Sequence, residues 1–313
     1  MSVGLIGSGG WGKNIARTLH ELKALGGIAE VRPDFREKLQ GVYPDVPLYA
    51  DHRVLMASEL PAVAIATPAA THVALAQEAL LAGKHVFVEK PLALSSREAE
   101  ELAELAEQRE RVLMVGHLLL YQPAVRWMKE YLDSGALGEL WSLHQERLNL
   151  GTVRTVENAL WSLGVHDVAV LLHLVGQAPE RTQAAGQIAL QPGIADDAYL
   201  HLAFPGGVRA HVHVSWLWPE KRRRLTVVGS ERMLVYDEGT QTVTLHRKRI
   251  GDGLKPVDEG EEVVFQGAAQ PLTLELEHFL TCIRDRRRPL SDGRSAVEVV
   301  RVLEEATRQM EGR

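Results

Sequence analysis

Short apolar runs alternate with amphipathic segments along the first third of the chain. Continuous apolar runs, the form expected for parallel strands covered on both faces, lie at residues 3–6, 62–67, 85–89 and 111–117. Between them, apolar residues recur at helical spacing, first at Ile15, Ala16, Leu19 and Leu22, and later over residues 73–82 and 95–110. Alternating strands and helices predict an α/β fold with a doubly wound parallel sheet, a Rossmann domain over residues 1–118.

The pattern changes after residue 118, where apolar and polar residues alternate as in half-buried strands. Such segments lie at residues 140–150, 198–204, 208–218, 224–230 and 232–237, and "FPGG" and "GSER" are turn signals between them. Helical patterns cover residues 123–132, 158–175, 271–285 and 293–310. This predicts a second, α+β domain over residues 119–313 with a large, mostly antiparallel open sheet. Its C-terminal helices could pack back on the first domain.

Composition narrows the class of protein. The 313 residues are 45% hydrophobic and carry a formal net charge of -6, which argues against a general nucleic-acid binder. No run approaches the ~20 apolar residues of a membrane span, and the N-terminus lacks the features of a secretory signal. Cys282, the single cysteine, excludes an internal disulfide and fits a cytoplasmic protein. No metal site is predicted, since His211 and His213 lack carboxylate partners nearby in the sequence.

A glycine motif follows the first apolar run. "GSGGWG" fits the G-x-G-x-x-G pattern between a strand and a helix, which is the context that the motif requires. The first glycine permits a tight turn, the second lets backbone approach a pyrophosphate, and the third lets helix and strand pack closely. The motif predicts a dinucleotide site formed by Gly7, Ser8, Gly9, Gly10, Trp11 and Gly12; the alternative is a glycine turn in a unit that binds nothing.

The residue about 20 positions later bears on the cofactor. Glu30 ends the short strand in "GGIAEVRPD". A carboxylate there accepts hydrogen bonds from the ribose hydroxyls and repels a 2′-phosphate, which favours NAD. Arg32 could meet such a phosphate, so NADP remains open. The alternative for Glu30 is a solvated charge at a strand end.

Three polar clusters follow predicted strands, at the edge where a parallel sheet binds ligands. They are Thr67 and Pro68 with His72, then Glu89-Lys90-Pro91 in "VFVEKPLAL", and Gly116-His117. Lys90 is either a charge in a solvated loop or a catalytic lysine at a cofactor cleft. His72 is equally well read as a helix-start residue, and His117 is similarly ambiguous.

The second domain holds one chemical cluster, in "NALWSLGVHDVAVLLHLVG". Ser162 and His166 lie four residues apart and share a helical face, whereas Asp167 points elsewhere. A histidine on an apolar helix is more often a core residue than a catalytic one. The basic run at 221–225 is similarly read as a charged sheet edge in preference to an anion site.

Several segments together resemble the glucose–fructose oxidoreductase and inositol dehydrogenase family (Gfo/Idh/MocA). They are "GSGGWGKN", "ATPAATH", "GKHVFVEKPLAL", "VGHLLLYQPAV", "WSLGVHD" and "LEHFLTCIRDRRRPL". The resemblance spans essentially the whole chain. It implies nicotinamide-dependent oxidation or reduction of a hydroxyl-bearing carbon on a sugar or polyol. It also implies a homo-oligomer, a dimer or tetramer, formed through the open sheet of the second domain.

The family's residues carry over onto particular positions. Lys90 matches the catalytic lysine, Glu89 the carboxylate before it, and Pro91 the proline after it. His166 matches the histidine that is commonly the acid/base of the family's D-x-x-x-H segment. Ser162 stands where that segment has its aspartate, and a serine holds no negative charge at neutral pH.

The segments "ERLNLGTVRTVENALWSLGVHD" and "SWLWPEKRRRLTVVGS" resemble a branch that acts on nucleotide-linked or other activated sugars. The predicted substrate contacts are His117, Tyr121, Arg147, Asn149, Asn158, Ser162 and His166; the predicted cofactor contacts beyond the glycine motif are Glu30, Thr67, Pro68, His72, Glu89 and Lys90. Two alternatives stay open. One is a reductase or NAD-dependent lyase of a non-sugar substrate, and the other is a weakly catalytic NAD-binding sensor or assembly protein.

Overall fold

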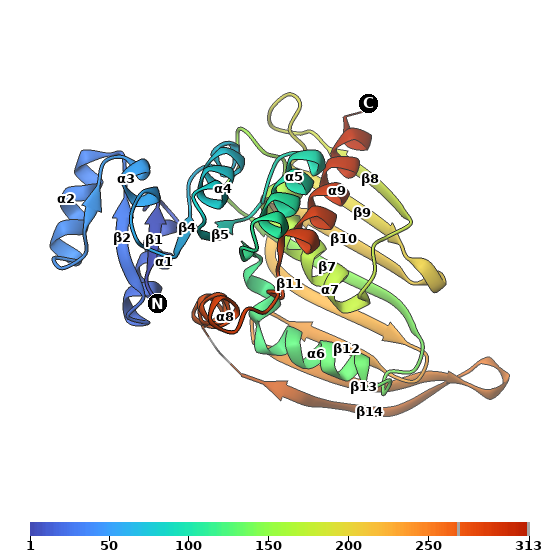
Figure 1. Cartoon of the computed structure of the whole chain (residues 1–313). Coiled ribbons are helices and arrows are strands. Elements are labelled where there is room, and N and C mark those ends of the chain that lie inside the picture. The colour runs from blue at the N-terminus through green and yellow to red at the C-terminus, as the bar shows by residue number, and fades with distance from the viewer. Residues whose placement is uncertain (268–269, 312–313) are drawn as a thin grey trace. The chain divides into compact units, whose positions relative to one another are not determined.

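The chain forms two compact units. The computed structural model describes residues 1–267 and 270–311. One unit comprises residues 1–118 together with 270–300, and the other comprises residues 119–269 together with 301–313. Figure 1 shows the course of the chain through both.

The first unit is built on a six-stranded sheet with the order β3-β2-β1-β4-β5-β6, and all its strand pairs are parallel. The strands are β1 (Val3–Ile6), β2 (Leu25–Ala29), β3 (Leu48–Tyr49), β4 (Ala62–Ile65), β5 (His85–Glu89) and β6 (Leu113–Gly116). This order is that of a doubly wound dinucleotide-binding sheet, so the predicted Rossmann fold is confirmed. β1 and β4 are buried at every position, as their continuous apolar sequences predict.

Helices follow the strands along the chain. They are α1 (Gly12–Glu21), α2 (Pro33–Val42), α3 (His52–Met56), α4 (His72–Leu81) and α5 (Ser96–Gln108), and α8 (Pro271–Asp285) joins this unit from far along the chain. Ser95 caps α5, because its hydroxyl oxygen accepts a hydrogen bond from the Glu98 N–H at 3.3 Å. Phe279 of α8 packs edge-on against Phe87 of β5, with the ring centroids 5.9 Å apart.

The second unit is built on an eight-stranded sheet with the order β14-β13-β12-β11-β7-β10-β9-β8. The strands are β7 (Leu140–Leu150), β8 (Arg181–Gln187), β9 (Asp197–Ala203), β10 (Arg209–Ser215), β11 (Leu217–Gly229), β12 (Met233–Asp237), β13 (Thr242–Gly251) and β14 (Lys255–Gln266). Only β7 and β10 pair in parallel, so the mostly antiparallel sheet is confirmed. The "FPGG" and "GSER" turns join β9 to β10 and β11 to β12 as predicted.

Helices α6 (Pro123–Asp133) and α7 (Val165–Val175) contact each other, and α7 packs on β7 and β10 (Figure 1). A five-residue π-helical turn, η3 (Leu160–Gly164), leads directly into α7. Gly176 ends α7 in the left-handed conformation, with φ 76°. The last helix is α9 (Gly293–Met310). No helix within residues 1–267 and 270–311 is long and apolar enough to cross a membrane.

Candidate functional site

The glycine motif forms the turn between β1 and α1. Gly7 has a φ of +86°, and a Cβ there would lie 2.8 Å from the carbonyl oxygen of Ala66. A Cβ on Gly12 would collide with the Gly7 carbonyl oxygen. Neither position tolerates a side chain, so the loop is shaped by the close approach of backbone to backbone. This leaves the N-terminal turn of α1 facing outward from the strand end, which is the usual cradle for a pyrophosphate.

Glu30 lies directly after β2 and is held by hydrogen bonds to both carboxylate oxygens. Ser8 donates its backbone N–H at 3.0 Å and its hydroxyl at 2.7 Å, and Arg32 donates Nε at 2.9 Å and Nη2 at 3.1 Å. Burial opposes the charge of Glu30, but the hydrogen bonds from Arg32 and Ser8 outweigh it and lower the pKa to about 2. Glu30 is therefore ionised throughout the physiological range and is already joined to the glycine loop.

His72 connects two of the strand-end clusters. It is buried at the start of α4, and its ring nitrogens lie 2.7 Å from the Pro91 carbonyl oxygen and 2.9 Å from the Thr67 carbonyl oxygen. Burial, with Lys90 nearby, lowers its pKa although both carbonyls oppose that. His72 thus positions the segments that follow β4 and β5.

Glu89 is the last residue of β5, and the Lys90–Pro91 peptide bond after it is cis. Glu89 pairs with Gly116 across the parallel ladder, and a Cβ on Gly116 would lie 3.1 Å from three atoms of the Glu89 carboxyl group. Burial raises the pKa of Glu89 to about 7, although Lys90, its backbone N–H and the nearby Trp11 indole all favour the charge. Trp11 of the glycine loop therefore lies near the strand end that carries Lys90.

His117 follows β6 at the same edge of the sheet. Its side chain is 2% exposed, and within the described ranges neither ring nitrogen has a hydrogen-bond partner. Burial lowers its pKa to about 3, and the charge of Lys90 acts in the same direction. His117 is therefore a neutral imidazole at physiological pH, with both nitrogens available to a ligand or water.

The second unit presents its cluster on η3 and α7. The Asn158 carboxamide oxygen accepts a hydrogen bond from the Trp161 N–H at 3.1 Å, and its backbone carbonyl accepts one from the Ser162 N–H at 3.0 Å. Asn158 therefore fixes the start of the π-helical turn that carries Ser162. His166 lies in the first turn of α7, beside Asp167.

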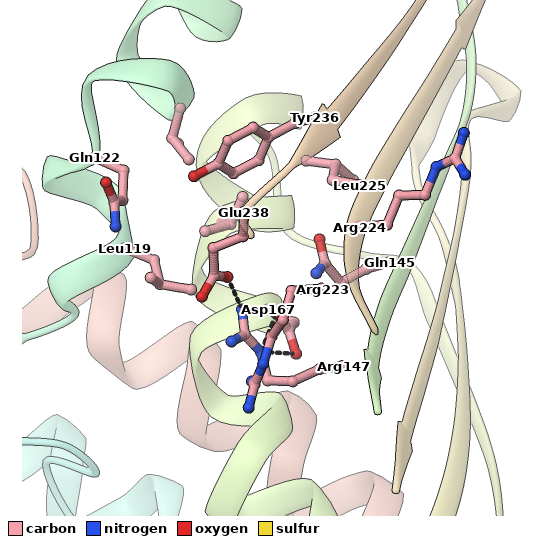
Figure 2. Close-up of a pocket in the computed structure, with 12 residues that line it drawn as sticks. Leu119, Gln122, Gln145, Arg147, Asp167, Arg223, Arg224, Leu225, Tyr236 and Glu238 are labelled. Carbon is pink, nitrogen blue, oxygen red and sulfur yellow. Dashed lines mark hydrogen bonds and ion pairs between the residues drawn. The ribbon is translucent and has the colours of Figure 1, made fainter. Parts of the chain in front are cut away.

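Arg147 on β7 is buried between two carboxylates (Figure 2). Its Nε lies 2.8 Å from Asp167 Oδ1, and its Nη2 lies 2.7 Å from Asp167 Oδ1 and 2.9 Å from Glu238 Oε2. Burial opposes the charge of Arg147, but Asp167 and Glu238 outweigh it and raise the arginine pKa further. The pairing of Arg147 with Asp167 and Glu238 was not predicted from the sequence, because these partners lie 20 and 91 residues away from Arg147 along the chain.

A small cavity of about 10 Å³, room for one water, borders this cluster. Arg223 of β11 lies on the same face, directly opposite Arg147, and donates from Nη2 to the Asn149 carboxamide oxygen at 3.2 Å. Burial and the charge of Arg147 lower the pKa of Arg223. The cavity is lined by Leu119, Gln122, Val125, Gln145, Arg147, Asp167, Val170, Arg223, Arg224, Leu225, Tyr236 and Glu238.

The predicted residues thus fall into two groups. The first unit gathers the glycine loop, Glu30, Thr67, His72, Glu89, Lys90 and His117 at the carboxyl edge of its sheet. The second unit carries Tyr121, Arg147, Asn149, Asn158, Ser162 and His166. Sequence reasoning missed Asp167, Glu238 and Arg223 as partners of the second group. No cluster of three or more histidine, cysteine or acidic residues suited to a metal ion occurs in the described parts of either unit.

Two family models match the chain. The oxidoreductase family with an NAD-binding Rossmann fold covers residues 1–117, and the GFO/IDH/MocA C-terminal domain covers residues 125–235. The chain belongs to the GFO/IDH/MocA oxidoreductase family. The family assignment and the oxidoreductase class predicted from the sequence are both confirmed.

Individual GFO/IDH/MocA proteins resemble the chain over most of its length. UDP-N-acetylglucosamine 3-dehydrogenase of Acidithiobacillus ferrooxidans is 29% identical, covering 94% of this chain and 92% of its own. A crystal structure of that enzyme aligns with a TM-score of 0.88, covering 100% of this chain and 98% of the other at 27% identity. Inositol 2-dehydrogenase of Burkholderia multivorans is 30% identical, covering 68% of this chain and 67% of its own.

Proposed function

We propose that this protein is an NAD-dependent dehydrogenase that oxidises a hydroxyl-bearing carbon of a nucleotide sugar, or reduces the corresponding ketone. The observation that carries the proposal is the position of Glu89 and Lys90. Glu89 ends β5 and Lys90 follows it, at the carboxyl edge of the sheet that also carries the glycine loop, and the Trp11 indole of that loop lies near enough to Glu89 to favour its ionised form. A charged amine beside a dinucleotide cradle suits chemistry on an oxygen next to the nicotinamide.

The cofactor residues fit NAD better than NADP. The Gly7 turn and the start of α1 suit a pyrophosphate, and the ionised Glu30 suits two ribose hydroxyls. Arg32 is half-exposed and shares its guanidinium with Glu30. For NADP, Arg32 would have to leave Glu30 to meet the phosphate, so NADP is the weaker ligand. We assign direct contacts to the glycine motif, Glu30, Thr67, Pro68 and Lys90, and positioning roles to His72 and Glu89.

The chemistry divides between the cofactor and two side chains. Bound nicotinamide supplies the hydride acceptor. His166 removes the hydroxyl proton as the carbon–hydrogen bond breaks, and Lys90 donates a hydrogen bond to the same oxygen. Lys90 thereby stabilises the negative charge that develops on that oxygen. His117, neutral and buried, offers a further hydrogen bond to a substrate hydroxyl.

The nucleotide-sugar assignment has two supports. The relative similar to this chain over 94% of its length acts, by its name, on UDP-N-acetylglucosamine. The second unit holds Asn149, Asn158 and Tyr121, together with Arg223, whose charge is partly desolvated. Amide and guanidinium donors suit hydroxyls and phosphates. Arg147 is already engaged by two carboxylates, so we propose that it positions the loop and strand around the substrate.

Lys90→Met tests the proposal. A panel of nucleotide sugars, inositols and free sugars is offered with NAD, and NADH absorbance identifies the substrate of the unchanged protein. We expect Lys90→Met to lower kcat by at least about 10³-fold, as expected for the loss of an electrostatic catalyst, while the Kd of NAD stays within about threefold. Near-normal turnover by the variant would exclude Lys90 from the chemistry.

Ser162 favours a second candidate function, that of a cofactor-binding sensor with little catalytic activity. Since Ser162 replaces the aspartate of the family's segment, the proton relay from His166 lacks its usual acid. Ser162→Asp separates the two possibilities. A rise in kcat of more than about tenfold would indicate a degraded site, whereas unchanged or reduced turnover indicates that this protein works without the acid.

We also propose that the protein is a cytoplasmic dimer or tetramer formed through the face of the eight-stranded sheet that α6 and α7 leave open. Large side chains there include Tyr199 and Val263, which are 45% and 58% exposed. Light scattering coupled to size exclusion would give the oligomer size. Tyr199→Glu should lower that size, and a monomeric unchanged protein would contradict the proposal.

A further inference from the structure

Two carboxyl groups, the partly buried Glu89 and the buried Glu275, lie near enough to influence each other beneath the strand end that carries Lys90. The Phe87–Phe279 ring contact fixes how α8 lies against β5. Glu89 is two residues beyond Phe87 and therefore on the same face of the strand, and Glu275 is one turn before Phe279 on the same face of the helix. The aromatic contact thus brings Glu275 beside Glu89.

The surroundings of Glu275 offer little to an ionised carboxyl group. Its side chain is 1% exposed, and its Oε1 has no hydrogen-bond partner within the described residues. Burial raises the pKa of Glu275 well above its ordinary value, and the charge of Glu89 raises it further. Both effects favour the protonated form of Glu275, the second for as long as Glu89 is ionised.

Other titratable groups face this pair from the neighbouring elements. Lys90 adjoins Glu89 on its own strand and favours its ionisation. His117 after β6 and His72 on α4 both feel the charge of Lys90, and burial holds the pKa of each low. The lowered pKa of each histidine disfavours its charged form, so the charge balance at this strand end is set chiefly by two carboxyl groups and one amine.

Two carboxyl groups in one water-poor site do not both ionise, because like charges at short range repel strongly there. The pair then holds at most one negative charge, which matches the single positive charge of Lys90. We propose that Glu89 and Glu275 act as one unit that supplies this charge to Lys90, and that either carboxyl group can hold it. Glu275 is in this sense a positioning residue for the catalytic amine, a role that rests on the proposed function of Lys90.

The Glu89–Glu275 pair keeps Lys90 charged without holding it in one rigid ion pair. Lys90 is partly buried, and an ammonium group withdrawn from water without a counter-charge loses its proton more readily. A neutral amine would donate a weaker hydrogen bond to the substrate oxygen. Because the negative charge can move to Glu275, loss of ionisation at Glu89 alone does not remove the counter-charge.

The test is a double-mutant cycle with Glu89→Gln, Glu275→Gln and the double variant, measuring kcat against pH for the substrate found in the panel. We expect the basic limb of the kcat–pH profile of each single variant to lie within about one pH unit of that of the unchanged protein, because the remaining carboxyl group ionises. In the double variant we expect the apparent pKa of the basic limb to fall by about two units relative to the unchanged protein. This is the usual effect of removing a neighbouring counter-charge. Glu277→Gln, at an exposed position of the same helix, is the matched control.

Additive effects of the two substitutions, or a double variant whose basic limb does not move, would overturn the proposal. A second readout does not need activity. In protein labelled with ¹³C at the glutamate carboxyl groups, NMR should show the Glu275 carboxyl ionising at lower pH in Glu89→Gln than in the unchanged protein. If no substrate is turned over, the proposed function fails, and this titration alone decides whether the two carboxyl groups form one unit.

Discussion

Arg32 and Glu30 form a two-pronged ion pair at the end of β2, with Nε 2.9 Å from Oε1 and Nη2 3.1 Å from Oε2. The Arg32 guanidinium also lies 3.4 Å from the centroid of the Phe35 ring, which holds its plane in place. The residue proposed to repel a 2′-phosphate and the residue that could accept one are thus joined, so the proposed choice between NAD and NADP involves both.

Cofactor preference should follow this pair. We expect Glu30→Ala to raise the Kd of NAD about tenfold or more, because charged hydrogen bonds contribute roughly 1.5–3 kcal/mol. It should affect NADP less, since the repulsion of the 2′-phosphate disappears and Arg32 is released. Fluorescence titration with both cofactors measures the change. Arg32→Ala is the control and should weaken NADP more than NAD; equal losses for both cofactors in Glu30→Ala would contradict this role.

The fold of the first unit could be predicted from the sequence, and the reason is physical. Contiguous signals such as Val3–Ile6, the glycine turn and the helical spacing of α1 determine the local structure, and the parallel sheet then brings the strand ends together. The hydrogen bonds within the site follow from side-chain conformations that no pattern encodes. The hydrogen bond from the Ser8 hydroxyl to Glu30, for example, could not be predicted from the glycine motif.

The Arg147–Asp167–Glu238 cluster should be important for stability. We expect Asp167→Ala to lower the free energy of unfolding by about 3–5 kcal/mol, because a buried guanidinium is left with one carboxylate in place of two. Urea denaturation followed by circular dichroism measures it. Glu238→Gln is the matched control, since Glu238 is 23% exposed and its loss should have a smaller effect. Equal, small losses in both variants would show that Arg147 relaxes into solvent.

The sequence held signals for this cluster and for Glu275 that are visible in retrospect. On β7, Gln145 and Arg147 continue the buried face that begins with Leu143, so polar residues occupy core positions of an alternating strand. On α8, Glu275 lies between Leu272 and Phe279 on the apolar face. A polar residue in register with core residues indicates a buried partner. Which partner it meets depends on the tertiary fold, which places Glu238 next to Arg147.

Acid should destabilise the protein through His117. Its folded pKa of about 3 lies below the ordinary value of 6.5, so the folded state binds the proton more weakly than the unfolded chain does. The stabilising contribution is therefore complete above pH 6.5 and is lost as the pH falls from 6.5 toward 3. We expect His117→Leu to remove up to about 3–4 kcal/mol of this pH dependence between pH 7 and pH 4. Unfolding free energies measured from pH 7 to pH 4 test this, and parallel curves for the two proteins would be the contrary result.

Gly116→Ala should disturb the site although no ionisable residue is replaced. The new methyl group would lie about 3.1 Å from the Glu89 carboxyl atoms, too close for an unstrained contact. We expect a loss of about 1–3 kcal/mol in unfolding free energy, typical of overpacking. Glu89→Asp in the same protein shortens the neighbour and should recover part of it. If Gly116→Ala were as stable as the unchanged protein, the Glu89 side chain would have to be free to move away.

The contact between Gly116 and Glu89 also bears on how this strand end can vary over evolutionary time. A side chain can arrive at position 116 only if the one at position 89 becomes shorter or turns away. Turning away would move the Glu89 carboxyl group away from Trp11 and alter the environment of Lys90. The two positions are therefore expected to change together or not at all. A library randomised at both sites at once should yield active pairs that libraries randomised at one site miss.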